Sequence, residues 1–423
     1  MSDSTGIPVL EWTGERMVPH ASDVATELYH WQRYQYFRPW YDGVRVIDAA
    51  SGEGYGTSYA ALFAHSALGI DVGEDAVRHA RNRYPIATFE VQDVCTADYS
   101  SADLVISFET IEHLQDPTQF LQALSSCSGR IVISTPNRKT HSPGNRLEDK
   151  PLNTFHTIEW TPLEFAELIQ QHFIGRQVRF LSQQADWPGT IREGLNDDAM
   201  YCIAVIGDGD LPQWPTIGVA IPTHNNAGGV GETILGLTRH YPGDMHFRVT
   251  ANACDAANLG ALAKLQTSMP NQVEILESEE NLGYGRGANL GFQALSEVEG
   301  VEYYAVINDD VMPAVDCVCE MVNAMQELDK LGHKPGVIGP VSNNVNGPQR
   351  VDVGTFGNLS EMHYRAELWQ RDKVNSATPS RQVRGLFLLI HPDCLREIGG
   401  FDPIFGIGNF EDDDHNLRCR LAG

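Results

Sequence analysis

Short apolar runs alternate with amphipathic helical stretches along most of this sequence. The alternation is regular from 44 to about 205, and it restarts at Thr216. Short buried strands that alternate with helices are typical of α/β domains with parallel sheets. The stretch 209–215 is rich in turn-forming residues and predicts a linker. We therefore expect two α/β domains in series, 1–208 and 216–423.

Composition narrows the classes of function. The 423 residues include 56 Asp and Glu against 30 Lys and Arg, a formal charge of −26. A surface of that sign repels phosphate backbones, so we expect no nucleic-acid partner. The eight cysteines have no C-x-x-C spacing, which predicts neither a zinc site nor a disulfide framework.

The sequence also gives information on targeting and membrane-spanning segments, and its last residues form a pattern of their own. No secretory signal and no apolar run long enough to span a bilayer is visible in the sequence, so we expect a cytoplasmic protein without a transmembrane segment. The last residues are charged and then helical, and they stop without a cap or a final strand. This pattern predicts a fragment truncated within a longer polypeptide.

The first candidate site is a glycine loop. The apolar run V-R-V-I-D-A leads into A-S-G-E-G-Y-G-T and then into a helical stretch. Gly52, Gly54 and Gly56 would allow positive φ values and a close approach to a ligand. Asp71 follows a second apolar run at the place where an acidic residue meets ribose hydroxyls in nucleotide-binding α/β folds. Asp93 ends a third run.

A fourth apolar run is followed by Glu109, Glu112 and His113, which we expect at the end of a strand. With these motifs in order, the chain resembles the class I S-adenosylmethionine-dependent methyltransferases over roughly residues 11 to 185. V-I-D-A-A-S-G-E-G-Y-G is similar to the family's first motif, and Q-D-V to its adenine-side motif. The resemblance implies a Rossmann-like fold and S-adenosylmethionine as cofactor. The cofactor-binding residues that follow are Asp48, Gly52, Gly54, Gly56, Asp71 and Asp93.

Two further segments, T-G-E-R-M-V-P and N-T-F-H-T-I-E-W, resemble a subgroup of these enzymes found with sugar-polymer genes. This resemblance implies a sugar hydroxyl as the methyl acceptor. A neutral imidazole can remove the hydroxyl proton as the methyl group arrives, and the candidates are His113 and His156. The residues alone do not choose between them.

The second half of the chain presents its polar residues at strand ends. T-I-G-V-A-I-P-T-H-N-N predicts a buried strand ending at Pro222 and Thr223, with a helix beginning near Gly231. A later glycine turn carries Arg286, which could approach a diphosphate. V-E-Y-Y-A-V-I-N-D-D-V places Asp309 and Asp310 after a strand, where hard oxygen ligands suit Mg or Mn.

From Thr216 onwards the chain resembles family 2 glycosyltransferases with the GT-A fold, particularly rhamnosyltransferase-like members. The motifs that carry the resemblance are I-P-T-H-N-N, E-N-L-G-Y-G-R-G-A-N-L-G, N-D-D-V, R-G-L-F-L-L-I-H-P-D-C-L-R-E-I-G-G-F-D-P-I-F and F-E-D-D-D-H-N-L-R. The resemblance implies a nucleotide-sugar donor, a glycan acceptor and a metal held by Asp310. The residues expected at the donor are Pro222, Thr223, Asn252, Arg286 and Asp309.

Matching the E-D motif residue by residue places the family's general base at Asp412, with Glu411 beside it. Asp412 would deprotonate the acceptor hydroxyl, which attacks the anomeric carbon and inverts its configuration. One departure concerns the nucleotide: Ala251 stands where the family usually has an acidic residue before Asn252. Thr223, Asn252 or Asp255 are the candidate substitutes.

Together these observations predict a bifunctional enzyme of polysaccharide assembly, a methyltransferase domain fused to an inverting glycosyltransferase domain. Rhamnose is the sugar that the resemblance suggests, and a lipid-linked acceptor at the inner face of the membrane is one version of the hypothesis. Two alternatives stay open. The first domain could be a non-catalytic platform beside an active glycosyltransferase, or the whole chain could be a glycan-assembly scaffold.

Overall fold

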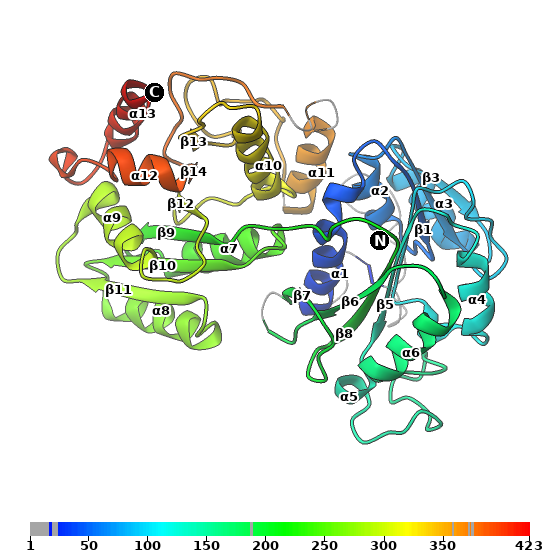
Figure 1. Cartoon of the computed structure of the whole chain (residues 1–423). Helices are drawn as coiled ribbons and strands as arrows, with labels where there is room; N and C mark the ends of the chain where they lie inside the picture. Colours follow the sequence, from blue (N-terminus) through cyan, green and yellow to red (C-terminus); the bar gives the residue numbers. More distant parts are fainter. Residues whose placement is uncertain (1–16, 19–23, 187–188, 358, 371–372, 374–375) are drawn as a thin grey trace. The chain divides into compact units, whose positions relative to one another are not determined.

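The computed structural model describes residues 17–18, 24–186, 189–357, 359–370, 373 and 376–423. The chain divides into two compact units, Met1–Pro212 and Gln213–Gly423. Each unit has a sheet of its own with helices packed on it (Figure 1). The predicted fold class, two α/β folds in series, is confirmed.

The sheet of the first unit has the strand order β3-β2-β1-β4-β5-β8-β6-β7. Strands β1 to β5 pair in parallel, whereas β8 runs antiparallel to both β5 and β6, and β7 antiparallel to β6. The carboxyl ends of β1, β2 and β4 therefore meet at one edge. The strands are β1 (Arg45–Ala49), β2 (Ser66–Asp71), β3 (Thr88–Val91), β4 (Leu104–Phe108), β5 (Arg130–Pro136), β6 (Val178–Gln183), β7 (Ile191–Glu193) and β8 (Tyr201–Ile206).

Local signals set the ends of several helices in this unit. Thr161 and Glu164 form a capping box at the start of α6, and Asp116 accepts amide hydrogens at the start of α4. Proline follows both caps, at the helix position that needs no amide hydrogen. The helices are α1 (Val24–Tyr36), α2 (Tyr55–Ala61), α3 (Glu74–Arg83), α4 (Pro117–Leu124), α5 (Arg138–His141) and α6 (Pro162–His172), with 3-10 turns η1 (Arg38–Trp40) and η2 (Ile111–His113).

The core of the first unit lies between the central strands and helices α4 and α6. Ile47, Val105 and Ile131 of the sheet pack in one buried cluster with Phe120 and Phe165 of these helices. Burying such side chains contributes roughly 1.5–3 kcal/mol each, which fixes the sheet and its loop-bearing edge.

The sheet of the second unit has the order β11-β10-β9-β12-β14-β13. Its first four strands are parallel, and β14 is antiparallel to β12 and β13. The strands are β9 (Ile217–Thr223), β10 (Met245–Asn252), β11 (Val273–Ser278), β12 (Tyr303–Ile307), β13 (Val337–Ile338) and β14 (Phe387–Ile390).

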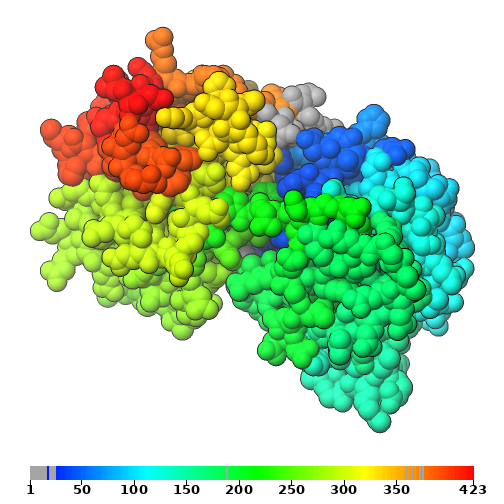
Figure 2. All heavy atoms as spheres, viewed as in Figure 1, coloured from blue at the N-terminus to red at the C-terminus, as the bar shows by residue number. Residues whose placement is uncertain are grey.

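The helices of this unit are α7 (Ala227–Arg239), α8 (Ala256–Ser268), α9 (Gly283–Leu295), α10 (Cys317–Lys330), α11 (Leu359–Gln370), α12 (Pro392–Ile398) and α13 (Glu411–Ala422), with a 3-10 turn η3 (Pro403–Phe405). Helix α7 begins at Ala227, earlier than the predicted Gly231, because the Asn226 side chain caps it by accepting the Gly229 amide hydrogen. Helices α12 and α13, orange to red in Figure 2, lie at the surface of the unit. None of the described helices combines the length and apolar character that spanning a bilayer requires.

Candidate functional site

The glycine loop of the first unit joins β1 to α2. Its backbone takes positive φ at Ala50 (63°), Gly52 (55°) and Gly54 (98°). Gly54 and Gly56 are also fixed by packing, since a Cβ on Gly56 would lie 2.0 Å from the Tyr34 ring and one on Gly54 would lie 2.7 Å from the Ala80 Cβ. The loop therefore passes closely between α1 and α3.

Asp71 ends β2 and holds the loop from the side. Its Oδ2 accepts the Gly52 amide hydrogen at 2.9 Å, and its Oδ1 accepts that of Gly73 at 2.7 Å. A carboxylate has about four lone-pair sites, so these two bonds leave Asp71 able to accept ribose hydroxyls. Asp93 follows β3, is exposed, and accepts the Cys95 amide hydrogen at 2.9 Å.

Asp48, at the end of β1, is buried and 1% exposed. It accepts a 2.7 Å hydrogen bond from Thr57 and longer bonds of 3.3 Å from the Tyr34 hydroxyl. Loss of solvation raises the pKa of Asp48 to about 7, although the hydrogen bonds from Thr57 and Tyr34 oppose the rise. This carboxyl is thus a shared anchor of α1, α2 and the glycine loop.

Several buried polar atoms near the glycine loop have no hydrogen-bond partner in the described part of the chain. Among the described residues, Ser51 Oγ in the loop and Nε and Nη2 of Arg33 are buried without a hydrogen-bond partner. Arg33 is 0% exposed, and its Nη1 lies 3.8 Å from Glu109 Oε1 and 2.8 Å from Gln183 Oε1. Unpaired buried donors carry a free-energy cost that a bound carboxylate or hydroxyl would remove. The residues present therefore fit a polar cofactor.

A cluster of acidic residues and histidines follows β4. His113 Nδ1 lies 3.1 Å from the Phe155 carbonyl oxygen, and His113 Nε2 lies 3.8 Å from Glu112 Oε1. The His113 and His156 rings have centroids 4.9 Å apart. The structure therefore brings together the two predicted histidines, 43 positions apart in sequence. One ligand atom each from Glu112, His113 and His156 lies within 4.8 Å of the others, a set that can also hold a metal ion.

The two histidines differ in exposure and partners. His156 is buried between Glu159, whose Oε1 lies 2.5 Å from Nδ1, and Asn153, whose Nδ2 lies 2.8 Å from Nε2. The His113 side chain is 23% exposed, against 6% for that of His156. Burial and the neighbouring Glu109 charge hold the pKa of Glu112 well above its usual range. Of the two histidines, His113 is the more exposed to solvent.

In the second unit, Thr223 and Asp309 meet at the carboxyl edge of β9 and β12. The Thr223 hydroxyl donates to Asp309 Oδ2 at 2.5 Å, and Asn226 Nδ2 donates to the Asp309 carbonyl oxygen at 3.3 Å. Asp310, the next residue, is exposed. Pro222 lies within β9, and a Cβ on Gly287 would come within 3.2 Å of the Pro222 Cβ.

Asn252 ends β10 beside this edge and is 3% exposed. Its Oδ1 is buried without a hydrogen-bond partner, and His224 Nδ1 lies 2.6 Å from its carbonyl oxygen. Arg286 lies on α9, is exposed, and donates from Nε to the Leu282 carbonyl oxygen at 3.0 Å. Ala251 is buried within β10, and Asp255 caps α8. Ala251 takes the position where an acidic residue is expected from the family resemblance. Asn252, the next residue, has a side-chain oxygen without a hydrogen-bond partner.

The resemblance to family 2 glycosyltransferases predicts a divalent metal in this unit, and the carboxylates of Asp309 and Asp310 are ligands of the kind that such an ion takes. Mg²⁺ is commonly held by one or two carboxylates together with substrate phosphates and water. No group of three metal-ligating side chains forms around Asp310 in the described part of the chain. The arrangement suits an ion whose remaining coordination positions are filled by a diphosphate.

The E-D motif lies at the start of α13, where its two carboxylates have different surroundings. Asp412 Oδ2 accepts the Gly385 amide hydrogen at 3.0 Å, and Oδ1 accepts that of Asp413 at 2.9 Å. Glu411 is 8% exposed, and its Oε2 has no hydrogen-bond partner among the described residues. Burial, and then the charge of Asp412, raises the pKa of Glu411.

The glycine turn at α9 also reaches this region. The Tyr284 hydroxyl donates to the Gly385 carbonyl oxygen at 2.5 Å, and a Cβ on Gly285 would lie 3.7 Å from the Glu411 Cβ. Within the described residues, no hydrogen bond or ion pair joins Asp309 or Asp310 to Glu411 or Asp412. The structure thus forms two polar groups in this unit, one at the strand edge and one at α13.

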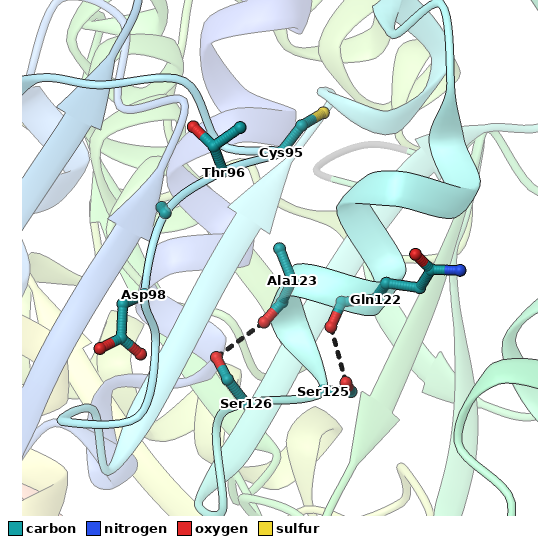
Figure 3. Close-up of a pocket in the computed structure, with 8 residues that line it drawn as sticks. Cys95, Thr96, Asp98, Gln122, Ala123, Ser125 and Ser126 are labelled. Atoms are coloured by element: carbon teal, nitrogen blue, oxygen red, sulfur yellow. Dashed lines mark hydrogen bonds between the residues drawn. The ribbon is translucent and has the colours of Figure 1, made fainter.

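A surface hollow of about 400 Å³ lies in the first unit between residues 95–98 and the end of α4 (Figure 3). The Ser125 and Ser126 hydroxyls on its rim donate to the carbonyl oxygens of Gln122 and Ala123. None of the predicted site residues lines this hollow. We assign it no role.

Several residues around the sites were not identified from the sequence. Arg33 and Tyr34 of α1 and Glu159 contact the predicted groups. The sequence signal for Arg33 and Tyr34 is the four-residue run Q-R-Y-Q inside α1, and this run does not show that Arg33 is buried.

Comparisons with known proteins match a different family to each of the two units. A family model described as a methyltransferase domain matches residues 41–188, and one described as glycosyl transferase family 2 matches 218–385. A Mycobacterium tuberculosis protein named "Probable S-adenosylmethionine-dependent methyltransferase" is 38% identical over 180 residues, 40% of this chain and 63% of that protein. A Mycolicibacterium smegmatis relative is 38% identical over 38% of this chain and 64% of its own length. The chain thus spans less than two thirds of these relatives.

More distant similarities involve the same unit. A ubiquinone biosynthesis O-methyltransferase of Arabidopsis thaliana is 26% identical over 29% of this chain and 40% of that protein. Among solved structures, a TehB-like S-adenosylmethionine-dependent methyltransferase from Corynebacterium glutamicum aligns with 18% identity and a TM-score of 0.32, over 43% of this chain and 88% of that one.

Proposed function

The chain carries a methyltransferase domain followed by a family 2 glycosyl transferase domain, and from this premise we propose that it is a bifunctional glycan-assembly enzyme. One unit methylates a sugar hydroxyl, and the other transfers a sugar, rhamnose in the leading version, from a nucleotide-sugar donor to a glycan acceptor. The observation that carries the proposal is that each unit gathers polar groups at the carboxyl edge of its own parallel strands, the ligand edge of such sheets.

In the first unit, we assign the cofactor to the glycine loop and the carboxylates around it. S-adenosylmethionine supplies an electrophilic methyl group when bound. Asp71 would accept ribose hydroxyls with its remaining lone pairs, and Asp93 would mark the adenine side. Arg33 has buried donors that suit the carboxylate of the amino-acid portion. Asp48, Gly52, Gly54 and Gly56 shape the loop.

We assign the general base of methyl transfer to His113. Its Nδ1 faces the Phe155 carbonyl oxygen, so this nitrogen carries the hydrogen and Nε2 carries the lone pair. Nε2 would take the proton of the acceptor hydroxyl. His156 is held by Glu159 and Asn153 and positions the His113 ring.

In the second unit, we assign the donor diphosphate to the Thr223–Asp309 edge, with Asp310 as the metal ligand. Mg²⁺ or Mn²⁺ there would offset the negative charge of the departing nucleotide diphosphate. Pro222, Asn252 and Arg286 would complete the donor site.

Asp412 would remove the acceptor proton and so drive attack with inversion. Two backbone amides fix the orientation of its carboxylate, which a positioned base requires. Glu411 lies beside it as a buried carboxyl with a raised pKa.

The acceptor side supports a lipid-linked glycan. Ile404, Ile407 and Phe410 precede α13 and are 80%, 68% and 68% exposed. Apolar side chains at this exposure are suited to a hydrocarbon anchor near the transferred sugar. We place the protein in the cytoplasm, peripheral to the inner face of the membrane, because S-adenosylmethionine and nucleotide sugars are available there.

The proposal is tested by incubating the chain with S-adenosylmethionine, Mn²⁺, a panel of nucleotide sugars and short lipid-linked or free glycans, with products read by mass spectrometry. We expect a sugar addition and a methyl addition that require different cofactors. Sugar addition alone would leave the first unit as a non-catalytic platform. Neither addition, with both ligands bound, would favour a scaffold and contradict the proposal.

A further inference from the structure

Two cysteines and a histidine of the second unit meet between α12 and α13. Cys394 lies on α12, and His415 and Cys419 lie one turn apart on α13. The Cys394 and Cys419 Sγ atoms are 3.3 Å apart, and Cys419 Sγ is 3.6 Å from His415 Nδ1. One ligand atom of each residue lies within 4.8 Å of the others. Neither proposed transfer reaction uses these three side chains.

The spacing of these atoms suits a tetrahedral metal. Zinc binds sulfur at about 2.3 Å and imidazole nitrogen at about 2.0–2.1 Å, which places neighbouring ligand atoms roughly 3.4–3.8 Å apart. The Sγ–Nδ1 separation of 3.6 Å lies within that range, and the Sγ–Sγ separation of 3.3 Å is shorter, by about half an ångström, than the roughly 3.8 Å expected for two sulfurs on zinc. Shifts of a few tenths of an ångström would therefore complete the site.

A glycine borders the two sulfurs, and the histidine beside them is buried. A Cβ on Gly336 would lie 3.1 Å from Cys394 Sγ and 3.6 Å from Cys419 Sγ, so a glycine borders both sulfurs. His415 is 1% exposed, and its Nε2 is buried without a hydrogen-bond partner. Nδ1 is the ring nitrogen that faces Cys419.

Bonds that do not involve the three ligands hold the two helices together. Arg418 donates from Nη1 to the Ile398 carbonyl oxygen and from Nη2 to that of Gly400, both at 2.7 Å. Its Nε also pairs with Asp414 at 2.7 Å. The ligands are therefore brought together before an ion arrives, which favours affinity.

We propose that Cys394, His415 and Cys419 form a zinc site with three protein ligands and one coordination position left for water or another ligand. Two thiolates and an imidazole favour zinc over Mg²⁺ or Mn²⁺, so this site differs in chemistry from the one assigned to Asp310. The ion would join α12 to α13, the helix that begins with Glu411 and Asp412. The sequence did not predict a zinc site because the two cysteines lie 25 positions apart.

The test uses the full chain without a polyhistidine tag, reduced with a non-chelating phosphine and loaded with Co²⁺. We expect about one equivalent of tightly bound Co²⁺ with sulfur-to-cobalt charge transfer in the near ultraviolet and the visible bands of tetrahedral cobalt, all displaced by Zn²⁺. Cys394→Ser and Cys419→Ser should lose the charge-transfer signal, and Cys317→Ser, a cysteine on α10, should keep it. Circular dichroism of the metal-free variants checks their fold.

A second measurement needs no variant. Zn²⁺ should protect Cys394 and Cys419 of the wild-type chain from a thiol-alkylating reagent, with the modified residues located by mass spectrometry. Absence of cobalt charge transfer together with unprotected cysteines would overturn the proposal. A Cys394–Cys419 disulfide that forms in air despite added Zn²⁺ would also overturn it, in favour of a redox-active pair.

Discussion

The Thr223 hydroxyl donates a 2.5 Å hydrogen bond to the Asp309 carboxylate, joining two residues 86 positions apart. Thr223 is the last residue of β9, and Asp309 follows the end of β12, the neighbouring parallel strand. The bond fixes the carboxylate next to Asp310, the residue assigned to the metal. Donor binding in our account depends on this junction.

Thr223→Ala should weaken binding of the nucleotide diphosphate with Mn²⁺. The carboxylate beside the metal ligand would no longer be held in place, and we expect roughly a tenfold rise in Kd, equivalent to about 1.4 kcal/mol. Isothermal titration calorimetry measures it. The matched control is Thr267→Ala, which removes an exposed hydroxyl bonded within α8 and should leave Kd unchanged. Unchanged affinity in Thr223→Ala would remove this edge from the donor site.

Asp412→Asn should abolish most glycosyl transfer, with a loss of about 10²–10⁴-fold in kcat, because the acceptor proton then has no base. Glu411→Gln should retain much more activity than Asp412→Asn. The glutamine side chain resembles the protonated carboxyl, which the raised pKa of Glu411 favours. Asp414→Asn, which breaks only the pair with Arg418, serves as the control. The reverse ranking of Asp412→Asn and Glu411→Gln would assign the base to Glu411.

His113→Ala should lower methyl transfer by about 10²–10⁴-fold and leave binding of S-adenosylhomocysteine unchanged. The reason is that His113 acts on the acceptor hydroxyl rather than on the cofactor. His172→Ala, which alters a histidine bonded to the Leu168 carbonyl oxygen on α6, is the control. Single-turnover assays with radiolabelled cofactor separate rate from binding. A full rate in His113→Ala would transfer the role to another group.

Asp48 should make the stability of the first unit depend on pH. Its pKa is raised to about 7 by burial, against 3.8 for an ordinary Asp, so between these values the folded state holds a proton that the unfolded state has lost. The free energy of unfolding should therefore fall as pH rises through this window, by up to about 1.4 kcal/mol per pH unit. Thermal unfolding of the first-unit transition from pH 4 to pH 8 measures the slope.

Asp48→Asn should flatten that slope. Asp103→Asn is the control, because the bond with Arg45 lowers the pKa of Asp103 to about 2, below the window. Identical slopes in wild type and Asp48→Asn would show that Asp48 is ionised throughout.

The sequence was sufficient to predict the fold class and the strands that carry the sites, because the short apolar runs at or just before Asp48, Asp71, Thr223 and Asp309 fit buried strands best. Local side-chain bonds were harder to predict. Three glycines in 228–231 suggested a late start for α7, whereas the Asn226 cap starts it at Ala227.

Long-range partners could not be predicted, since they depend on how the elements pack. Nothing in the pattern of α1 places Arg33 beside Glu109, or Tyr34 against Gly56. Likewise, the E-D motif does not show that packing buries Glu411 and gives Asp412 two backbone donors.

The central claim, two independent working sites in one chain, is tested most directly by calorimetric titration of the wild type, Asp71→Asn and Asp310→Asn with S-adenosylhomocysteine and with a nucleotide diphosphate plus Mn²⁺. We predict that Asp71→Asn weakens only the first ligand and Asp310→Asn only the second. Failure of the wild-type chain to bind either ligand, or loss of both ligands in one variant, would contradict the account.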